Sequence, residues 1–136
     1  MKRIDLLHRI QAERADYRYL GERTPNEGEE HITTATEALV RWVEGFNSGK
    51  LNPRLTWRNH SPTGFNWGYG GSGPAQLALA ILADFTGDKD FTLRHYQDFK
   101  RDFLATSRMS SASRFEIAAG EIIAWIRIQP LDDGET

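Results

Sequence analysis

Four glycines stand directly before a proline-led apolar run, in the order Gly68, Gly70, Gly71 and Gly73. Pro74 suits the first turn of a helix, because its φ is already helical and the N–H that it lacks would have no partner there. The first amides of a helix have no acceptor within the helix, and the helix dipole adds partial positive charge at that end. The segment Gly68–Gly73, called the glycine loop below, therefore predicts an anion-binding site. The expected donors are the amides of Ser72, Gly73, Ala75 and Gln76.

Side chains in and near the glycine loop fit the same ligand. Upstream, Arg58 adds a positive charge, and His60 can bond a phosphate or transfer a proton. Tyr69 offers a ring that can stack on a base. The predicted ligand-binding set is Arg58, His60, Tyr69, Gly70, Gly71, Ser72, Gly73 and Gln76.

Two well-known phosphate-binding motifs are excluded. Gly68, Gly70 and Gly73 satisfy the spacing G-x-G-x-x-G, which wraps a pyrophosphate in dinucleotide-binding folds. That fold needs two parallel strands joined across the helix, whereas here one predicted helix follows another. The lysine and hydroxyl of the G-K-[ST] motif are also absent, so the chain is not a P-loop NTPase.

A second interpretation of the glycine loop stays open. The tract from Gly45 to Ala83 has no Asp or Glu but contains Lys50, Arg54 and Arg58, which favours an anion. The tract could equally lack acids because it is mostly loop and buried helix. The glycines could then serve only to let the loop cross tightly over a core of Phe65, Trp67 and Tyr69.

Catalytic and metal-binding patterns are weak. The chain has no cysteine, and His8, His31 and His95 are scattered without the spacing of metal ligands. Ser61 and Ser72 have no obvious base except His60. We therefore predict no catalytic residue, no metal site and no cofactor, and an enzyme that uses His60 ranks last among the functions considered.

The first half of the chain predicts one short helix and several short strands. Residues 1–15 have the apolar spacing of an amphipathic helix. Tyr17–Leu20, Ile32–Thr36 and Leu39–Glu44 predict strands, with a helix over Thr36–Phe46 as the alternative. The further predictions are a turn at Asn47, Ser48 and Gly49, and an extended segment over Leu51–Asn59 that completes a hairpin.

The second half predicts three helices. Ala75–Phe85 is apolar nearly all round and should be the central buried helix, with Ser72 or Gly73 as its N-cap and Gly87 as its C-terminal cap. Asp88 can cap the next helix, in which an aromatic or histidine recurs every fourth residue. Ser107–Ser113 predicts a polar linker. Ile117–Ile128 predicts the last helix, with Ile122, Trp125 and Ile126 inward.

Length and composition set the architecture. The 136 residues suffice for one core, so we expect a helical extension at residues 1–16 and a single α+β domain over residues 17–136. In it, a small antiparallel sheet from the N-terminal half packs against a C-terminal layer of three helices. A net charge of −2 argues against nucleic acid as a partner. The longest apolar run is too short to span a membrane, and the expected location is the cytoplasm.

The segments YLGERTP, HSPTGFNWGYGGSGPAQLALAIL and YQDFK resemble those of a small prokaryotic and viral domain family of unknown function. The resemblance spans roughly residues 17–128. A remote likeness, carried by Gly70, Ser72 and Gln76, is to the viral ring nuclease anti-CRISPR proteins, which bind cyclic oligoadenylate as dimers. Their histidine follows the glycine, where this chain has Gly71, so the likeness implies nucleotide binding without that nuclease chemistry.

Two functions are carried forward. The first is a cytoplasmic protein that binds a phosphorylated small molecule or nucleotide signal at the glycine loop. The alternative is a protein-interaction module, such as an inhibitor of a host defence complex, in which the glycine loop is structural. A homodimer stays open for either, because Leu6, Leu7 and Ile10 form an apolar face on the first predicted helix.

Overall fold

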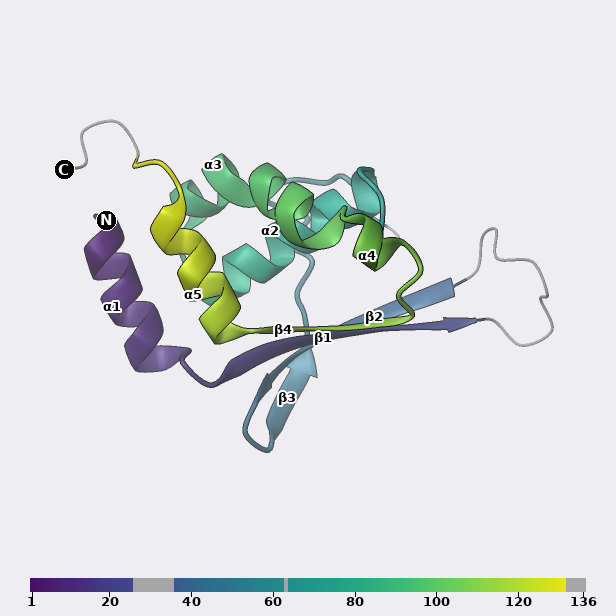
Figure 1. Ribbon diagram of the computed structural model, residues 1–136, viewed down its shortest axis with the longest axis horizontal. Coiled ribbons are helices and arrows are strands. Elements are labelled where there is room, and N and C mark those ends of the chain that lie inside the picture. Colours follow the sequence, from purple (N-terminus) through teal and green to yellow (C-terminus); the bar gives the residue numbers. More distant parts are fainter. Residues whose placement is uncertain (26–35, 63, 132–136) are drawn as a thin grey trace.

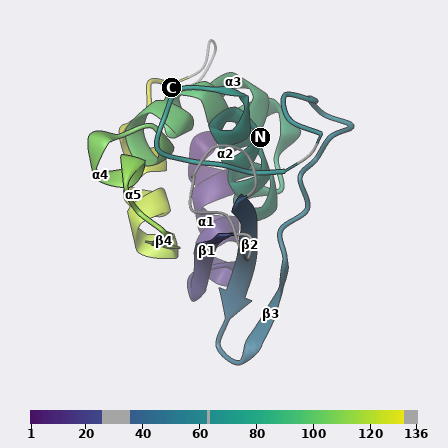
Figure 2. The same ribbon diagram turned by 90° about the vertical axis from the view of Figure 1, so that its right-hand side faces the viewer.

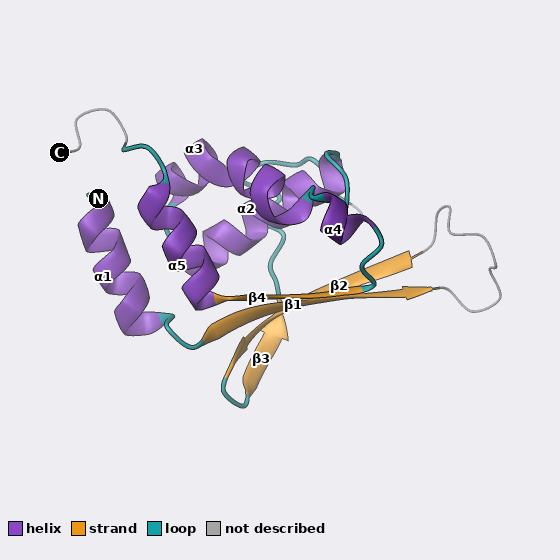
Figure 3. Ribbon diagram, in the orientation of Figure 1, coloured by secondary structure: helices purple, strands orange, loops and turns teal. Residues whose placement is uncertain are grey.

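A computed structural model describes residues 1–25, 36–62 and 64–131 of the chain. Its helices are α1 (Arg3–Glu13), α2 (Ser72–Thr86), α3 (Lys89–Phe99), α4 (Ser107–Ser110) and α5 (Ala119–Ile128), and a π-helical turn, η1 (Lys100–Leu104), continues α3. Its strands are β1 (Tyr17–Pro25), β2 (Thr36–Glu44), β3 (Asn47–Lys50) and β4 (Arg114–Ala118). The helices α2 to α5 lie over one face of the sheet (Figures 1 and 3). The predicted α+β class is confirmed.

The sheet is antiparallel throughout, in the order β3-β2-β1-β4. Leu39–Glu44 lies in β2, so the strand prediction is correct and the helical alternative is wrong. Gly45 takes a φ of +57° at the turn between β2 and β3, which glycine adopts without strain. The predicted turn at residues 47–49 is therefore wrong. The turn lies at residues 45 and 46, and residues 47–49 belong to β3. The predicted strand over Ile32–Thr36 lies, except for Thr36, outside the described residues.

The predicted extended segment over Leu51–Asn59 is also wrong. One hydrogen bond, from the Leu51 N–H to the Val40 carbonyl (3.0 Å), prolongs the hairpin, and no strand follows. Pro53 has no N–H to give to a sheet, and Arg54 has a φ of +57°, which a strand cannot accommodate. The segment instead leaves the sheet and crosses to the helical layer.

The fourth strand was not predicted. Arg114–Ala118 alternates between exposed and buried side chains, with Phe115 and Ile117 facing the core. The predicted last helix begins only at Ala119, and residues 107–110 of the predicted linker form α4. Five residues that run straight into an apolar helix are too few for a period-two pattern to stand out.

The centre of the core is α2, as predicted. Its residues from Gly73 to Ala83 are all buried, as are Phe85 and Thr86. Gly87 ends it with a φ of +61°, and the Asp88 carboxylate accepts the N–H of Phe91 (2.9 Å) to cap α3. These caps are confirmed. The N-cap of α2 is Gly71, one residue before the predicted position.

The N-terminal helix packs on this core. Leu6 and Ile10 are fully buried in the same hydrophobic cluster as α2, while Ile4 is exposed. Arg3 donates to the carbonyls of Gln129 and Pro130, next to the end of α5, and Figure 1 shows α1 and α5 at the same end of the molecule. The apolar face of α1 that suggested a homodimer is thus covered within the chain.

Tyr19 connects the sheet to α2. The environment of its hydroxyl predicts that the protein loses stability at alkaline pH. Its buried hydroxyl donates to the Asp84 carboxylate (2.7 Å). Burial, followed by the charge of Asp84, raises the pKa of Tyr19 far above its usual value. The folded chain therefore keeps this proton after the unfolded chain has lost it. Stability from this group is complete below about pH 10 and declines above it, by roughly 1.4 kcal/mol per pH unit.

This dependence can be measured by urea unfolding at several pH values. The Tyr19→Phe variant should be less stable at neutral pH, because it loses a buried hydrogen bond, but its stability should fall less steeply above about pH 10. Equal slopes for the two proteins would show that Tyr19 ionises in the folded state as it does in the unfolded one.

Candidate functional site

The N-terminus of α2 presents two amides that the helix does not use. Gly71 is the N-cap, and the N–H of Ala75 donates to its carbonyl (3.1 Å). The N–H of Gln76 likewise has the Ser72 carbonyl as its helical acceptor. The helix offers no acceptor to the N–H groups of Ser72 and Gly73. The predicted set of four donors is therefore reduced to these two, with Ser72 exposed and Gly73 buried at the start of the helix.

Tyr69 lies across the start of the helix. A Cβ atom on Gly71 would collide with the Tyr69 ring. A Cβ atom on Gly73 would stand 2.6 Å from the Cβ of Asn66 and 3.2 Å from the Tyr69 hydroxyl. Both glycines are thus required for close packing, and Tyr69 keeps 48% of its surface exposed. Its hydroxyl lies beside Gly73.

Gly68, the first residue of the glycine loop, packs against η1 and α4. The Gly68 N–H donates to the Leu104 carbonyl (2.6 Å), with φ at +93°. The indole of Trp67, which is fully buried, donates to the Ala112 carbonyl (2.9 Å). Gly70 has open space where a Cβ would stand. Three of the four glycines therefore have a packing role, and Gly70 has none.

Arg23, on β1, reaches the glycine loop and was not predicted. Its guanidinium lies over the Trp67 ring, 4.3 Å from the centroid, and donates to the Trp67 carbonyl. Its Nε is buried and has no hydrogen-bond partner in the part of the chain that is described. Burial lowers the pKa of Arg23, and the nearby Tyr69 partly opposes this shift. In the sequence Arg23 stands in a charged segment that suggests a solvated turn, and only the position of β1 beside the loop reveals it.

Gln76, predicted as a ligand contact, instead ties a loop to α2. It is fully buried. Its Oε1 accepts the N–H groups of His60 (2.8 Å) and Ser61 (3.2 Å). Its Nε2 donates to the carbonyls of Pro53 (2.5 Å) and Arg58 (3.0 Å). All four hydrogen-bonding positions of the amide are used within the chain.

The remaining predicted residues lie on the loop that Gln76 holds. The ring of His60 shares a hydrogen bond of 2.7 Å with the Tyr96 hydroxyl, between Nε2 and Oη. Arg58 is exposed, and its guanidinium donates to the Trp57 carbonyl (2.9 Å). The structure thus gathers Tyr69, Gly71, Ser72 and Gly73 with Arg23, and places Arg58 and His60 on the loop beyond Gln76.

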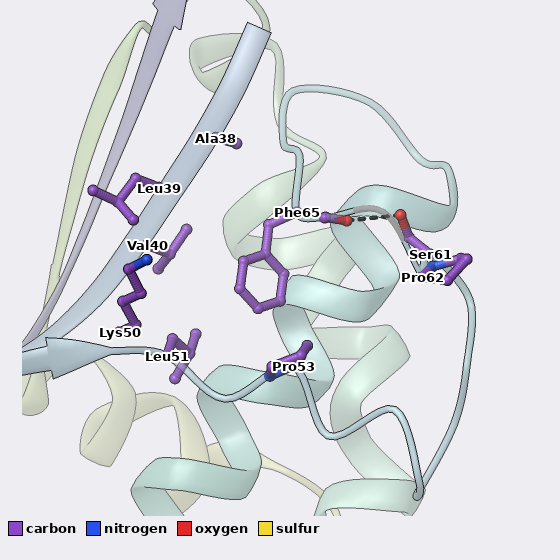
Figure 4. Close-up of a pocket in the computed structure, with 10 residues that line it drawn as sticks. Ala38, Leu39, Val40, Lys50, Leu51, Pro53, Ser61, Pro62 and Phe65 are labelled. Carbon is purple, nitrogen blue, oxygen red and sulfur yellow. Dashed lines mark hydrogen bonds between the residues drawn. The ribbon is translucent and has the colours of Figure 1, made fainter. Parts of the chain in front are cut away.

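A cavity of about 230 Å³ lies between this loop and the edge of β2. In Figure 4 the Phe65 ring points into it, opposite Val40 and Leu51. Its lining is mainly apolar, with Lys50 and Ser61 as the polar side chains, and the Ser61 hydroxyl donates to the Gly64 carbonyl (2.7 Å). None of the predicted ligand-binding residues lines this cavity.

The part of the chain that the structure describes has neither a metal cluster nor a membrane span. Within residues 1–25, 36–62 and 64–131, no three His, Asp or Glu side chains are grouped so that they could hold a metal ion. Among the same residues, no helix has both the length and the apolar character needed to cross a membrane.

Comparison with known protein families gives a match over most of the chain. A model of a family of unknown function, DUF6166, matches residues 19–128. No curated protein and no solved structure matches the chain. The matched range contains the glycine loop, α2 and Arg23, and excludes all of α1. The chain therefore belongs to the DUF6166 family of unknown function.

Proposed function

We propose that this protein binds a phosphorylated small molecule or nucleotide at the glycine loop, without turnover. The observation that carries the proposal is Arg23. Its guanidinium is half-buried beside Tyr69 and has no carboxylate partner among the described residues. Arginine stays charged in proteins, and its planar fork suits phosphate oxygens.

Among the described residues, no carboxylate is paired with Arg23. Glu22 precedes Arg23 in β1, but its carboxylate lies 3.7 Å from Arg114. Successive residues of a strand point to opposite faces, so the Glu22 side chain leaves from the other face of the sheet. No acid occurs between Gly45 and Ala83. An anion beside Tyr69 would therefore meet Arg23, the Tyr69 hydroxyl and the amides of the α2 start.

Nucleotides are the ligand class that we favour. The half-exposed ring of Tyr69 offers a surface for a base next to the donors for a phosphate. The remote likeness to the viral ring nuclease anti-CRISPR proteins adds cyclic oligoadenylates to the ligands to be tested. Binding without turnover is favoured because Ser72 has no described base beside it and the His60 ring is bonded to Tyr96.

The test is calorimetric titration and thermal shift with inorganic phosphate, AMP, ADP and cyclic oligoadenylate. Arg23→Gln should weaken binding by roughly 10- to 100-fold, because a charge-assisted hydrogen bond contributes about 1.5–3 kcal/mol. Arg18→Gln, on the same strand but in an exposed pair with Glu116 (3.1 Å), is the matched control and should bind normally.

Two outcomes would end the proposal. In the first, none of these anions raises the melting temperature or gives measurable heat. In the second, Arg23→Gln and Arg18→Gln bind a nucleotide equally well while circular dichroism shows both to be folded. Arg23→Lys, which keeps the charge and loses the planar fork, should bind with intermediate affinity.

A protein-interaction module is the second candidate, favoured by Phe46. This side chain is fully exposed at the turn between β2 and β3, and Figures 1 and 2 show that hairpin projecting away from the helices. The packing roles of Gly68, Gly71 and Gly73 agree with a glycine loop that is purely structural. This function would be preferred if no anion bound and Gly73→Asp left binding to a protein partner intact.

A further inference from the structure

The outer edge of β4 has main-chain groups that the sheet does not use. Arg23 donates its N–H to the Ser113 carbonyl (2.8 Å), and the register of β1 with β4 continues from this pair. In an antiparallel ladder, alternate residues bond to the neighbouring strand. Ser113, Phe115 and Ile117 therefore bond to β1. Arg114 and Glu116 direct their N–H and C=O groups to the outside, because β4 is the last strand of the sheet that the described residues form.

A groove of about 460 Å³ runs along this edge. One wall is β4, and the other comes from η1 and α4, which lie over β4 at the side of the sheet (Figures 1 and 2). Phe103, Met109, Phe115 and Ile117 make its apolar lining. A row of free main-chain groups beside an apolar wall is the arrangement by which proteins take up an extended peptide as an added strand.

The groove is lined by basic side chains at one end and by acidic side chains at the other. Arg108 and Arg114 lie at the end next to α4. At the other end, the Glu121 carboxylate accepts the N–H of Ala118 (2.9 Å), and Asp102, which is also paired with Arg101 (2.9 Å), accepts the indole N–H of Trp125 in α5 (2.9 Å). An occupant with a base at the α5 end and an acid at the α4 end would be complementary to this pattern.

We propose that the β4 groove binds an extended segment of a partner protein as a fifth, antiparallel strand. Two apolar side chains of the segment, opposite Phe115 and Ile117, would enter the groove. The residues between them would pair with Arg114 and Glu116 through the main chain. Because Glu121 already occupies the Ala118 N–H, the pairing is limited to about five residues. This surface is independent of the anion proposed at the glycine loop.

The probe is a dye-labelled peptide with blocked ends and the sequence Lys-Val-Lys-Val-Glu, titrated by fluorescence anisotropy. In the antiparallel register its valines face the groove, and its third and fifth residues bond to Glu116 and Arg114. N-methylation of those two residues should abolish binding, whereas N-methylation of the two valines, whose N–H groups point away, should be tolerated. The charge-reversed peptide Glu-Val-Glu-Val-Lys should bind at least about tenfold more weakly.

A pair of protein variants tests the same edge by changing the protein in place of the peptide. Glu116→Pro removes an N–H that faces outward, which an edge strand tolerates, and should lose the peptide. Glu116→Ala keeps that N–H and should bind within about twofold of the unaltered chain. The proposal is overturned if no peptide saturates the protein at about 1 mM, the weak limit of specific binding. It is also overturned if both N-methylated peptides bind alike. Should Glu116→Pro not fold, the two methylated peptides decide the matter on the unaltered chain.

Discussion

Replacing Gly68 with alanine is expected to lower the free energy of unfolding by about 3 kcal/mol. An alanine at a φ of +93° is strained, and its Cβ would stand 2.8 Å from both the Met109 carbonyl oxygen and the Ser110 Cα. Both neighbours are main-chain atoms, so the collision cannot be relieved by rotating a side chain. Urea unfolding followed by circular dichroism would measure the loss.

Gly70→Ala is the matched control within the same loop. A Cβ on Gly70 would have no neighbouring atom within 4 Å, and the φ of this residue is not positive. The change should alter stability by less than about 0.5 kcal/mol. If Gly70→Ala were as damaging as Gly68→Ala, the glycine loop would owe its glycines to something other than close packing on α4.

Gln76→Ala should cost about 4 kcal/mol, the larger of the two effects. The truncation leaves the N–H groups of His60 and Ser61 and the carbonyls of Pro53 and Arg58 without their partner. Because the Gln76 amide is fully buried, water cannot replace its hydrogen bonds unless the loop opens. Beyond the loss of stability, residues 53–61 should become sensitive to limited proteolysis in the native state.

Gln97→Ala, on the exposed face of α3, is the control for removing a glutamine from a helix. It should be nearly neutral, because that side chain is not buried. Near-equal stabilities of the two variants would mean that the loop is held by its other contacts. If Gln76→Ala kept its stability but was cleaved faster, Gln76 would hold the loop in place without contributing to the global stability of the fold.

Local signals predicted α2 and α3 well. Gly87 and Asp88 mark the end of α2 and the start of α3, and both are recognisable because a cap acts on residues within one turn of itself. The burial of α2 on every side also follows from the apolar run itself. Such features depend on neighbours in sequence, which is why one chain suffices to find them.

The errors in the sheet have a different origin. Whether Arg114–Ala118 is a strand depends on β1, whose residues are almost a hundred positions away. Whether residues 51–59 are extended depends on Gln76, which takes up main-chain groups that a strand would have used. Pairing between distant segments leaves no periodic trace in so few residues.

For the candidate site, the glycine loop and the start of α2 were found from sequence because glycine, proline and an apolar run are a local signal for a helix N-terminus. The contribution of Arg23 and the structural role of Gln76 could not be found from the sequence. Arg23 reaches the loop only because β1 lies beside it, and Gln76 turns inward only because a loop from another part of the chain needs its amide.

The amino-acid sequence alone determined the α+β class, the central helix with its C-terminal cap, and the glycine-rich segment in which that helix begins. These properties follow from interactions within a few residues and from the burial of apolar runs. Only the tertiary structure decided which glycines are there for packing, which arginine stands beside the helix start, and which strand has a free edge. Each of these depends on contacts between segments far apart in the chain, where the same residue types in sequence are compatible with several arrangements in space.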